Sequence, residues 1–226
     1  MKRLPLIAAA LILCAGAAHA ASVSGRVNFV TKRGQHPVAN ETLVWLEPAV
    51  ADAKTPKRPP ATFQMVTRGK MLIPHVLPIP LGSTVTFPND DPISHNLFSL
   101  SSGNSFDLGL YRRGAGKLET FTTPGVVNVY CNVHPNMSAV IHVMQTPWYT
   151  LADQNGSYAF SEIPAGRYRL VAWNELSGTA QSPIEVNNSG LVSGELALTL
   201  DSRNYRIVQH MDKTGKPYQT SIAKDY

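Results

Sequence analysis

The chain has 226 residues, of which 43% are hydrophobic and 15% are charged, and its formal net charge is +5. Its 17 prolines and 16 glycines fall short of the bias typical of collagen, and the composition argues against intrinsic disorder. We therefore expect a folded, turn-rich protein, long enough for one large or two small domains.

The first twenty residues have the pattern of a cleaved secretory signal. Lys2 and Arg3 precede an apolar run from Leu6 to Ala18, which is followed by His19 and Ala20. This run is shorter than the roughly 20 apolar residues that a membrane span needs. We predict cleavage after Ala20, secretion into a bacterial periplasm and no membrane span in the mature chain, with an uncleaved anchor as the alternative.

The rest of the chain has the pattern of short strands, with period-2 alternation between turn residues. No window of twelve or more residues has a convincing helical period, so we predict an all-β fold built from β-sandwiches. The predicted strands run from Val23 to Val30, Thr42 to Glu47, Thr62 to Thr67, Ser83 to Phe87, Leu118 to Thr122, Val126 to Cys131, Ala139 to Met144, Ser157 to Phe160, Arg167 to Trp173 and Gly194 to Leu200.

Two stretches mark candidate domain boundaries, a basic Pro-rich linker between Val50 and Pro60 and the pair Thr146-Pro147. The linker lacks interleaved aromatic residues, which favours a solvated segment over a nucleic-acid site. Without the signal, 18 basic residues face 15 acidic ones, so the mature chain is only weakly basic. We therefore predict no nucleic-acid partner. The polar residues 202–226 are predicted to form a loosely ordered tail.

Cys131 is the first residue that indicates chemistry. Cys14 leaves with the predicted signal, so Cys131 has no partner for an intramolecular disulfide. The alternation of the preceding strand places Cys131 on its apolar face. The loop that follows, Cys131-Asn-Val-His-Pro-Asn-Met137, contains a thiolate, an imidazole and a thioether, and His95 lies upstream just after a turn.

Two imidazoles, one thiolate and a weak thioether suit copper, because soft sulfur favours Cu(I) and imidazole suits Cu(II). Methionine is not a ligand of structural zinc sites, which argues against zinc. The alternative is a buried free cysteine beside an exposed histidine and a core methionine. We predict a copper site built from four residues, His95, Cys131, His134 and Met137.

These motifs resemble those of the cupredoxins, the small blue-copper electron carriers. Residues 61–145 look like a complete cupredoxin domain, and the short loop CNVHPNM is most similar to that of amicyanin. The resemblance implies a Greek-key β-sandwich with one type 1 copper ion. In it His95, Cys131 and His134 would be equatorial ligands and Met137 the axial one. Asn96, directly after the first ligand, and Asn132, in place of the usual Ser or Thr, would tie the two ligand loops together.

The flanking segments resemble a second module, a transthyretin-like sandwich of the carboxypeptidase-regulatory type. The similarity rests on Val23-Ser-Gly-Arg-Val and Thr42-Leu-Val-Trp-Leu before the linker, and on the run from Ile163 to Trp173 near the end. This combination resembles methylamine-utilisation proteins. It implies that residues 21–58 and 146–201 form one discontinuous sandwich into which the cupredoxin domain is inserted. The alternative is a sequential two-domain layout.

Other polar residues receive simpler interpretations. His142 alternates away from the apolar face of its strand, which predicts a surface histidine. Asp90 and Asp91 precede Pro92 and are predicted to form the turn and to be solvated. The sequence has no Gly-x-Ser-x-Gly, Walker or Rossmann motif, and we predict no catalytic residues.

The resulting hypothesis is a secreted one-electron carrier that docks a donor and then an acceptor protein. In the cupredoxin resemblance the ring edge of His134 reaches the surface, so this histidine is the expected electron exit. A largely uncharged docking patch is predicted around it, formed by Pro92, Ile93, Pro135 and Asn136. The alternatives are a copper-delivery or storage protein and a secreted binding or scaffold module with a structural copper.

Overall fold

The computed structural model describes residues 21–33, 37–50, 56–205 and 209–218, so the predicted signal lies outside the described residues. Within these ranges the only helix is the 3-10 turn η1 (Ala39–Glu41), and none is long and apolar enough to cross a membrane. The predicted all-β class is therefore confirmed. The strands are β1 (Ala21–Val30), β2 (Leu43–Pro48), β3 (Thr62–Gln64), β4 (Val66–Arg68), β5 (Met71–Ile73), β6 (Val76–Pro80), β7 (Thr84–Asn89), β8 (Leu97–Ser99), β9 (Phe106–Asp107), β10 (Gly114–Thr120), β11 (Gly125–Cys131), β12 (Ser138–Met144), β13 (Tyr149–Leu151), β14 (Ser157–Ile163), β15 (Gly166–Asn174), β16 (Gly178–Val186), β17 (Val192–Gly194) and β18 (Ala197–Asp201).

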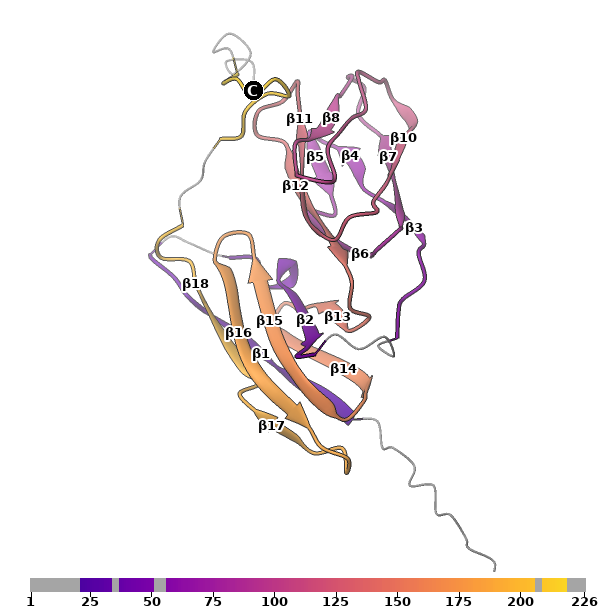
Figure 1. Cartoon of the computed structure of the whole chain (residues 1–226). Helices are drawn as coiled ribbons and strands as arrows, with labels where there is room; N and C mark the ends of the chain where they lie inside the picture. Colours follow the sequence, from indigo (N-terminus) through magenta and orange to yellow (C-terminus); the bar gives the residue numbers. More distant parts are fainter. Residues whose placement is uncertain (1–20, 34–36, 51–55, 206–208, 219–226) are drawn as a thin grey trace, which may run out of the picture.

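Strands β3 to β12 form one sandwich, which we call the central sandwich (Figure 1). One sheet has the order β10-β7-β4-β5 with β3 beside β7, and the other has the order β6-β12-β11-β8-β9. Alternate residues of β7 and β11, such as Phe87 and Val129, are fully buried in a core that the two sheets share. Because Cys131 continues the buried series of β11, strand alternation places its thiol at the end of this core.

The remaining strands form a second unit, which we call the flanking sandwich. Its sheets have the orders β14-β1-β18 and β13-β2-β15-β16-β17, with a separate core between them. Val23 of β1 pairs with Phe160 of β14, and Trp45 of β2 pairs with Val171 of β15. Strands that precede the central sandwich in the chain therefore share sheets with strands that follow it.

The two sandwiches meet at the outer face of β12. His142 is only 5% exposed, with its ring centroid 4.3 Å from that of Trp173 and 6.3 Å from that of Trp45. The prediction of a surface histidine was therefore wrong. Alternation does direct His142 away from the central core, but the flanking sandwich covers that face. A second contact joins the units, since His75 Nε2 lies 2.5 Å from Glu175 Oε2.

The end of the described chain returns from the flanking to the central sandwich. Residues 209–218 lie beside the end of β11, where Figure 1 shows them in yellow. Tyr218 and Lys213 make hydrogen bonds there, although composition alone predicts a loosely held tail. The rest of that predicted tail, 219–226, lies outside the described residues.

Candidate metal centre

The loop between β11 and β12 is closed by its own backbone. The amide of Cys131 donates to the carbonyl of Met137 at 3.0 Å, and the amide of Met137 donates to the carbonyl of His134 at 3.1 Å. Both bonds form across a turn of only a few residues, so the loop cannot splay without breaking them. The thiol and the imidazole therefore start from backbone positions that are fixed relative to each other.

His95 comes from a different part of the chain, between β7 and β8. Its backbone forms an isolated antiparallel bridge with Tyr111, and the carbonyl of Asn96 accepts a hydrogen bond from the amide of Asn132 at 2.8 Å. Leu97, the first residue of β8, pairs with Cys131. A backbone hydrogen bond between Asn132 and Asn96 thus joins the two loops.

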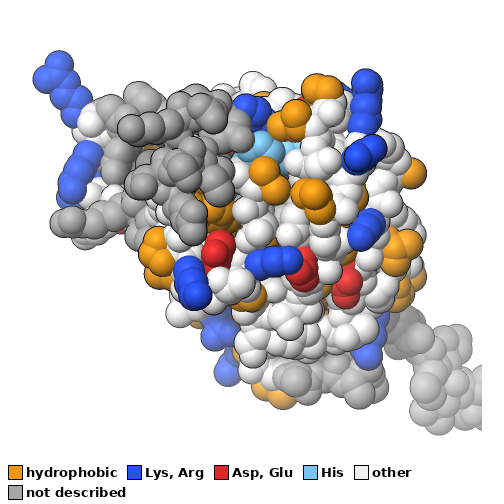
Figure 2. Space-filling model, turned by 90° about the horizontal axis from the view of Figure 1, so that it is seen from above, with side chains coloured by type: hydrophobic (Ala, Val, Ile, Leu, Met, Phe, Trp, Pro, Cys, Tyr) orange, Lys and Arg blue, Asp and Glu red, His pale blue; other side chains and the backbone are white. Residues whose placement is uncertain are grey.

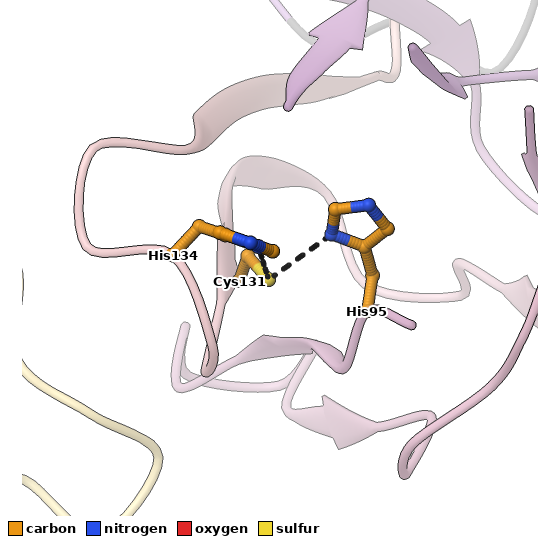
Figure 3. Close-up of side chains that lie close together, drawn as sticks. All are labelled: His95, Cys131 and His134. Atoms are coloured by element: carbon orange, nitrogen blue, oxygen red, sulfur yellow. Dashed lines mark hydrogen bonds between the residues drawn. The ribbon is translucent and has the colours of Figure 1, made fainter. Parts of the chain in front are cut away.

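Three donor atoms converge at this end of the central sandwich (Figure 3). The Cys131 sulfur lies 3.7 Å from Nδ1 of His95 and 3.5 Å from Nδ1 of His134, and all three atoms lie within 4.8 Å of one another. Nitrogen and sulfur ligands at metal bond lengths of about 2.0 and 2.3 Å in a tetrahedral arrangement would be about 3.5 Å apart. The two sulfur–nitrogen distances therefore match those of ligands bound to one ion.

The three side chains are buried, with exposed fractions of 0% for His95 and Cys131 and 5% for His134. Burial, with a smaller electrostatic contribution from His95 and Lys70, lowers the pKa of His134 to about 4. Burial also lowers the pKa of His95, against the opposing effect of Asp91. Both imidazoles are therefore neutral at neutral pH, the form that offers a lone pair to a metal ion.

The thiol of Cys131 is in an apolar environment with a few polar contacts. Burial raises its pKa, while hydrogen bonds from the backbone N–H groups of Asn96, Val133 and His134 act in the opposite direction. These N–H groups would stabilise negative charge on the sulfur once a cation replaces the proton. The site is thus preorganised for a thiolate that is bound to a metal ion.

Asp91 is the site residue whose role sequence reasoning missed. Its side chain is buried, and Oδ2 accepts a hydrogen bond from Nε2 of His95 at 3.0 Å and from the amide of Lys70 at 2.9 Å. The prediction of a solvated carboxylate was therefore wrong for Asp91, because these donors replace water. The same prediction agrees with Asp90, whose side chain is 41% exposed and pairs with Arg68. The available signal was the presence of a carboxylate four residues before a predicted ligand.

Met137 is buried in the core of the central sandwich, with 1% of its surface exposed. Its backbone, as described above, closes the loop through both its amide and its carbonyl. Methionine thus lies in the same turn as Cys131 and His134, and its side chain is shielded from water.

The face above the site is largely uncharged. Figure 2 shows histidine at the surface beside hydrophobic and uncharged side chains, with one Lys or Arg nearby and the acidic groups farther away. Three of the predicted docking residues, Pro92, Ile93 and Asn136, are exposed. Pro135 is buried, so its side chain is not part of that surface.

Comparison with known proteins gives structural similarities only. No family model matches the chain, and no curated protein matches it. A purple cupredoxin from Nitrosopumilus maritimus is 28% identical over 36% of this chain and 98% of its own, with a TM-score of 0.32. The copper-containing nitrite reductase of Thermus scotoductus SA-01 is 25% identical over 53% of this chain and 28% of its own, with a TM-score of 0.35. A Cu(I) form of a mutant amicyanin is 19% identical over 45% of this chain and 98% of its own, also with a TM-score of 0.35.

Proposed function

We propose that the central sandwich is a cupredoxin domain that holds one type 1 copper ion and carries single electrons between redox partner proteins. The observation that carries this proposal is the convergence of a buried thiol and two buried imidazole nitrogens within 4.8 Å. His95, Cys131 and His134 would be the equatorial ligands. Met137, which lies in the same loop as Cys131 and His134, would be a weak fourth ligand.

A bound copper ion would supply the exchange of one electron between Cu(I) and Cu(II). The protein side chains would hold that ion in a single arrangement for both states, because Asp91 orients His95 and the backbone fixes the loop. Burial excludes water from the donors, which limits rearrangement of solvent when the charge changes. The donors are also too enclosed to admit a substrate, which favours a carrier over an enzyme.

His134 is the most exposed of the three donors, so we infer that electrons leave and enter at this residue. Pro92, Ile93 and Asn136 would form the contact surface for the donor and the acceptor protein. A small, uncharged contact favours the brief encounters that electron transfer requires.

The proposal includes the domain organisation of the chain around the metal centre. Residues 61–145 would be the cupredoxin domain, inserted into a transthyretin-like sandwich made of 21–58 and 146–201, as in methylamine-utilisation proteins. The shared sheets of β1 with β14 and of β2 with β15 support this division. Residues 1–20 would be a cleaved signal, which directs the mature chain to the periplasm without a membrane span.

Repeated redox cycling in the presence of a copper chelator tests the carrier function. The copper-loaded protein is oxidised and reduced several times against a chelator of Cu(I) and Cu(II), and the bound metal is measured after each cycle. A carrier changes oxidation state fully and retains its copper. Loss of copper to the chelator would indicate delivery or storage instead, and copper that stays bound without changing oxidation state would indicate a structural role.

A further inference from the structure

The C-terminal segment 209–218 contacts both parts of the candidate metal centre. The hydroxyl of Tyr218 donates a hydrogen bond of 2.6 Å to the backbone carbonyl of Cys131. The amide of Lys213 donates one of 2.9 Å to the side-chain Oδ1 of Asn132, the next residue. Two consecutive residues of the loop are thus held by a segment that is more than eighty positions away in the sequence.

A second link reaches the loop that contains His95. Lys213 Nζ lies 2.7 Å from Oδ2 of Asp107, whose Oδ1 accepts a hydrogen bond from the side chain of Asn96 at 2.6 Å. Although partial burial acts to raise it, hydrogen bonds from Lys213, Asn96 and Gly109 lower the pKa of Asp107 to about 2. The carboxylate is therefore charged at any physiological pH and can join the C-terminal segment to the residue after the first histidine.

An aromatic contact adds apolar packing to these hydrogen bonds. The ring of His210 stacks on that of Tyr130, with centroids 4.1 Å apart and planes inclined by 16°. It also lies nearly perpendicular to the ring of Tyr218, at a centroid distance of 5.3 Å. Tyr130 is the residue before Cys131 in β11. The segment therefore contacts three consecutive residues at the end of that strand, from 130 to 132.

The segment also has internal structure that presents Lys213. The amide of Asp212 donates to the carbonyl of Lys216 at 2.8 Å, and Oδ1 of Asp212 accepts from the amides of Thr214 and Lys216. Gly215 has a φ of 76°, a conformation that glycine adopts without strain. This closed turn fixes the backbone of Lys213, so its amide and its ammonium group reach different loops.

We propose that residues 209–218 act as a strap that positions the loop 131–137 for metal binding, with Tyr218 and Lys213 as its positioning residues. The inference rests on the proposed copper function, because it assigns the strap a role at that site. A loop already held in its bound conformation loses less entropy when it binds an ion, and so binds more tightly. The hydroxyl of Tyr218 also points the positive end of its dipole at Cys131, the residue that would provide the thiolate.

Hydrogen exchange of the full-length, metal-free protein tests the positioning directly. In Tyr218→Phe the ring remains, and the hydroxyl loses its hydrogen bond to the carbonyl of Cys131 and its weaker 3.4 Å contact with Nδ1 of His210. We expect the amides of Cys131 and Met137 to exchange about fivefold faster, as expected for the loss of one hydrogen bond of about 1 kcal/mol. Lys213→Ala should have a similar effect through Asp107 and Asn96. Tyr205→Phe and Lys57→Ala, which change the same residue types outside the segment 209–218, should leave both amides unaffected.

The reduction potential of the copper-loaded protein is a second measurement, and it does not depend on the overall stability of the fold. Tyr218→Phe should lower the reduction potential relative to the Tyr205→Phe control, because a positive dipole near the site favours Cu(I). The strap proposal would be wrong if the loop amides exchanged at an unchanged rate in the Tyr218→Phe/Lys213→Ala double variant. It would also be wrong if the amides of 209–218 were unprotected in the parent protein. The exchange experiment contains no metal, so its outcome is independent of whether the parent protein binds copper.

Discussion

Asp91 and His95 form a buried carboxylate–imidazole pair, with Oδ2 of the aspartate 3.0 Å from Nε2 of the histidine. Because Nε2 is the nitrogen that donates to Asp91, the lone pair of Nδ1 is free to face the sulfur of Cys131, 3.7 Å away. Pairs of this kind fix the tautomer and the orientation of metal-binding histidines. The turn after β7 thus determines how His95 approaches the site.

Asp91→Asn should weaken copper binding about 10- to 100-fold, the usual effect of losing such an orienting partner. It should also raise the reduction potential, because removing a negative charge near the site favours Cu(I). Competition against a chelator of known affinity and voltammetry measure the two effects. Asp90→Asn is the matched control, since the carboxylate of Asp90 is partly exposed and pairs with Arg68 instead of His95. Equal effects of the two substitutions would contradict the role of Asp91.

Met137→Gln should retain copper and lower the reduction potential. An oxygen donor is harder than a thioether and favours Cu(II), while a weakly bound thioether would contribute little to affinity. Met144→Gln, at the other end of β12 and outside the loop, should leave the potential unchanged. An unchanged or higher potential in Met137→Gln, measured by cyclic voltammetry, would mean that Met137 is not the axial ligand.

The interface between the sandwiches should be sensitive to acid through His142. Burial lowers the pKa of His142 from 6.5 to about 4. Between these values the unfolded chain binds a proton that the folded chain does not, so stability is complete above pH 6.5 and is lost as the pH falls toward 4. The loss should approach about 3 kcal/mol.

His142→Phe isolates this contribution, because it removes the titrating ring and keeps a ring of similar shape against Trp45 and Trp173. Urea unfolding of the metal-free protein between pH 7.5 and 4.5 measures the difference. The variant should lose less stability than the parent protein over this range. If the two proteins have parallel pH profiles, His142 does not titrate in this window.

The fragment 61–145 should fold alone and bind copper, because it contains every strand from β3 to β12. Its affinity should be lower than that of the full chain, since the strap is missing. The fragment 146–226 should not fold, because it lacks β1, which lies between β14 and β18, and β2, which lies between β13 and β15. A cooperative thermal transition and dispersed amide signals from 146–226 would instead support a sequential domain layout.

The sequence predicts most of this fold because the relevant signals are local. The alternation of β11 places Cys131 correctly, and the turn after it has a recognisable spacing of donors. Several strands are not predicted, among them β16, because Pro183 interrupts its alternating pattern and proline is rare away from sheet edges. In the structure β16 lies between β15 and β17, with Pro183 paired to Arg169.

The features that the sequence did not predict depend on contacts between distant segments. Alternation indicates on which side of β12 His142 lies, but not that Trp173 covers that side. The sequence motif predicts that Asp91 lies in a turn. It does not predict that the amides of Gly69 and Lys70 donate hydrogen bonds to its carboxylate and so allow its burial. In the same way, composition alone gives no sign that Tyr218 reaches Cys131.

The visible absorption spectrum of the protein loaded with one equivalent of Cu(II), before and after ascorbate, tests the central claim most directly. Charge transfer from the thiolate of Cys131 to copper should give an intense blue colour that bleaches on reduction and returns on reoxidation. Cys131→Ser, nearly isosteric with the parent residue, should fold normally and remain colourless. A colourless Cu(II) complex of the unmutated protein, or a blue complex of Cys131→Ser, would contradict the proposed site.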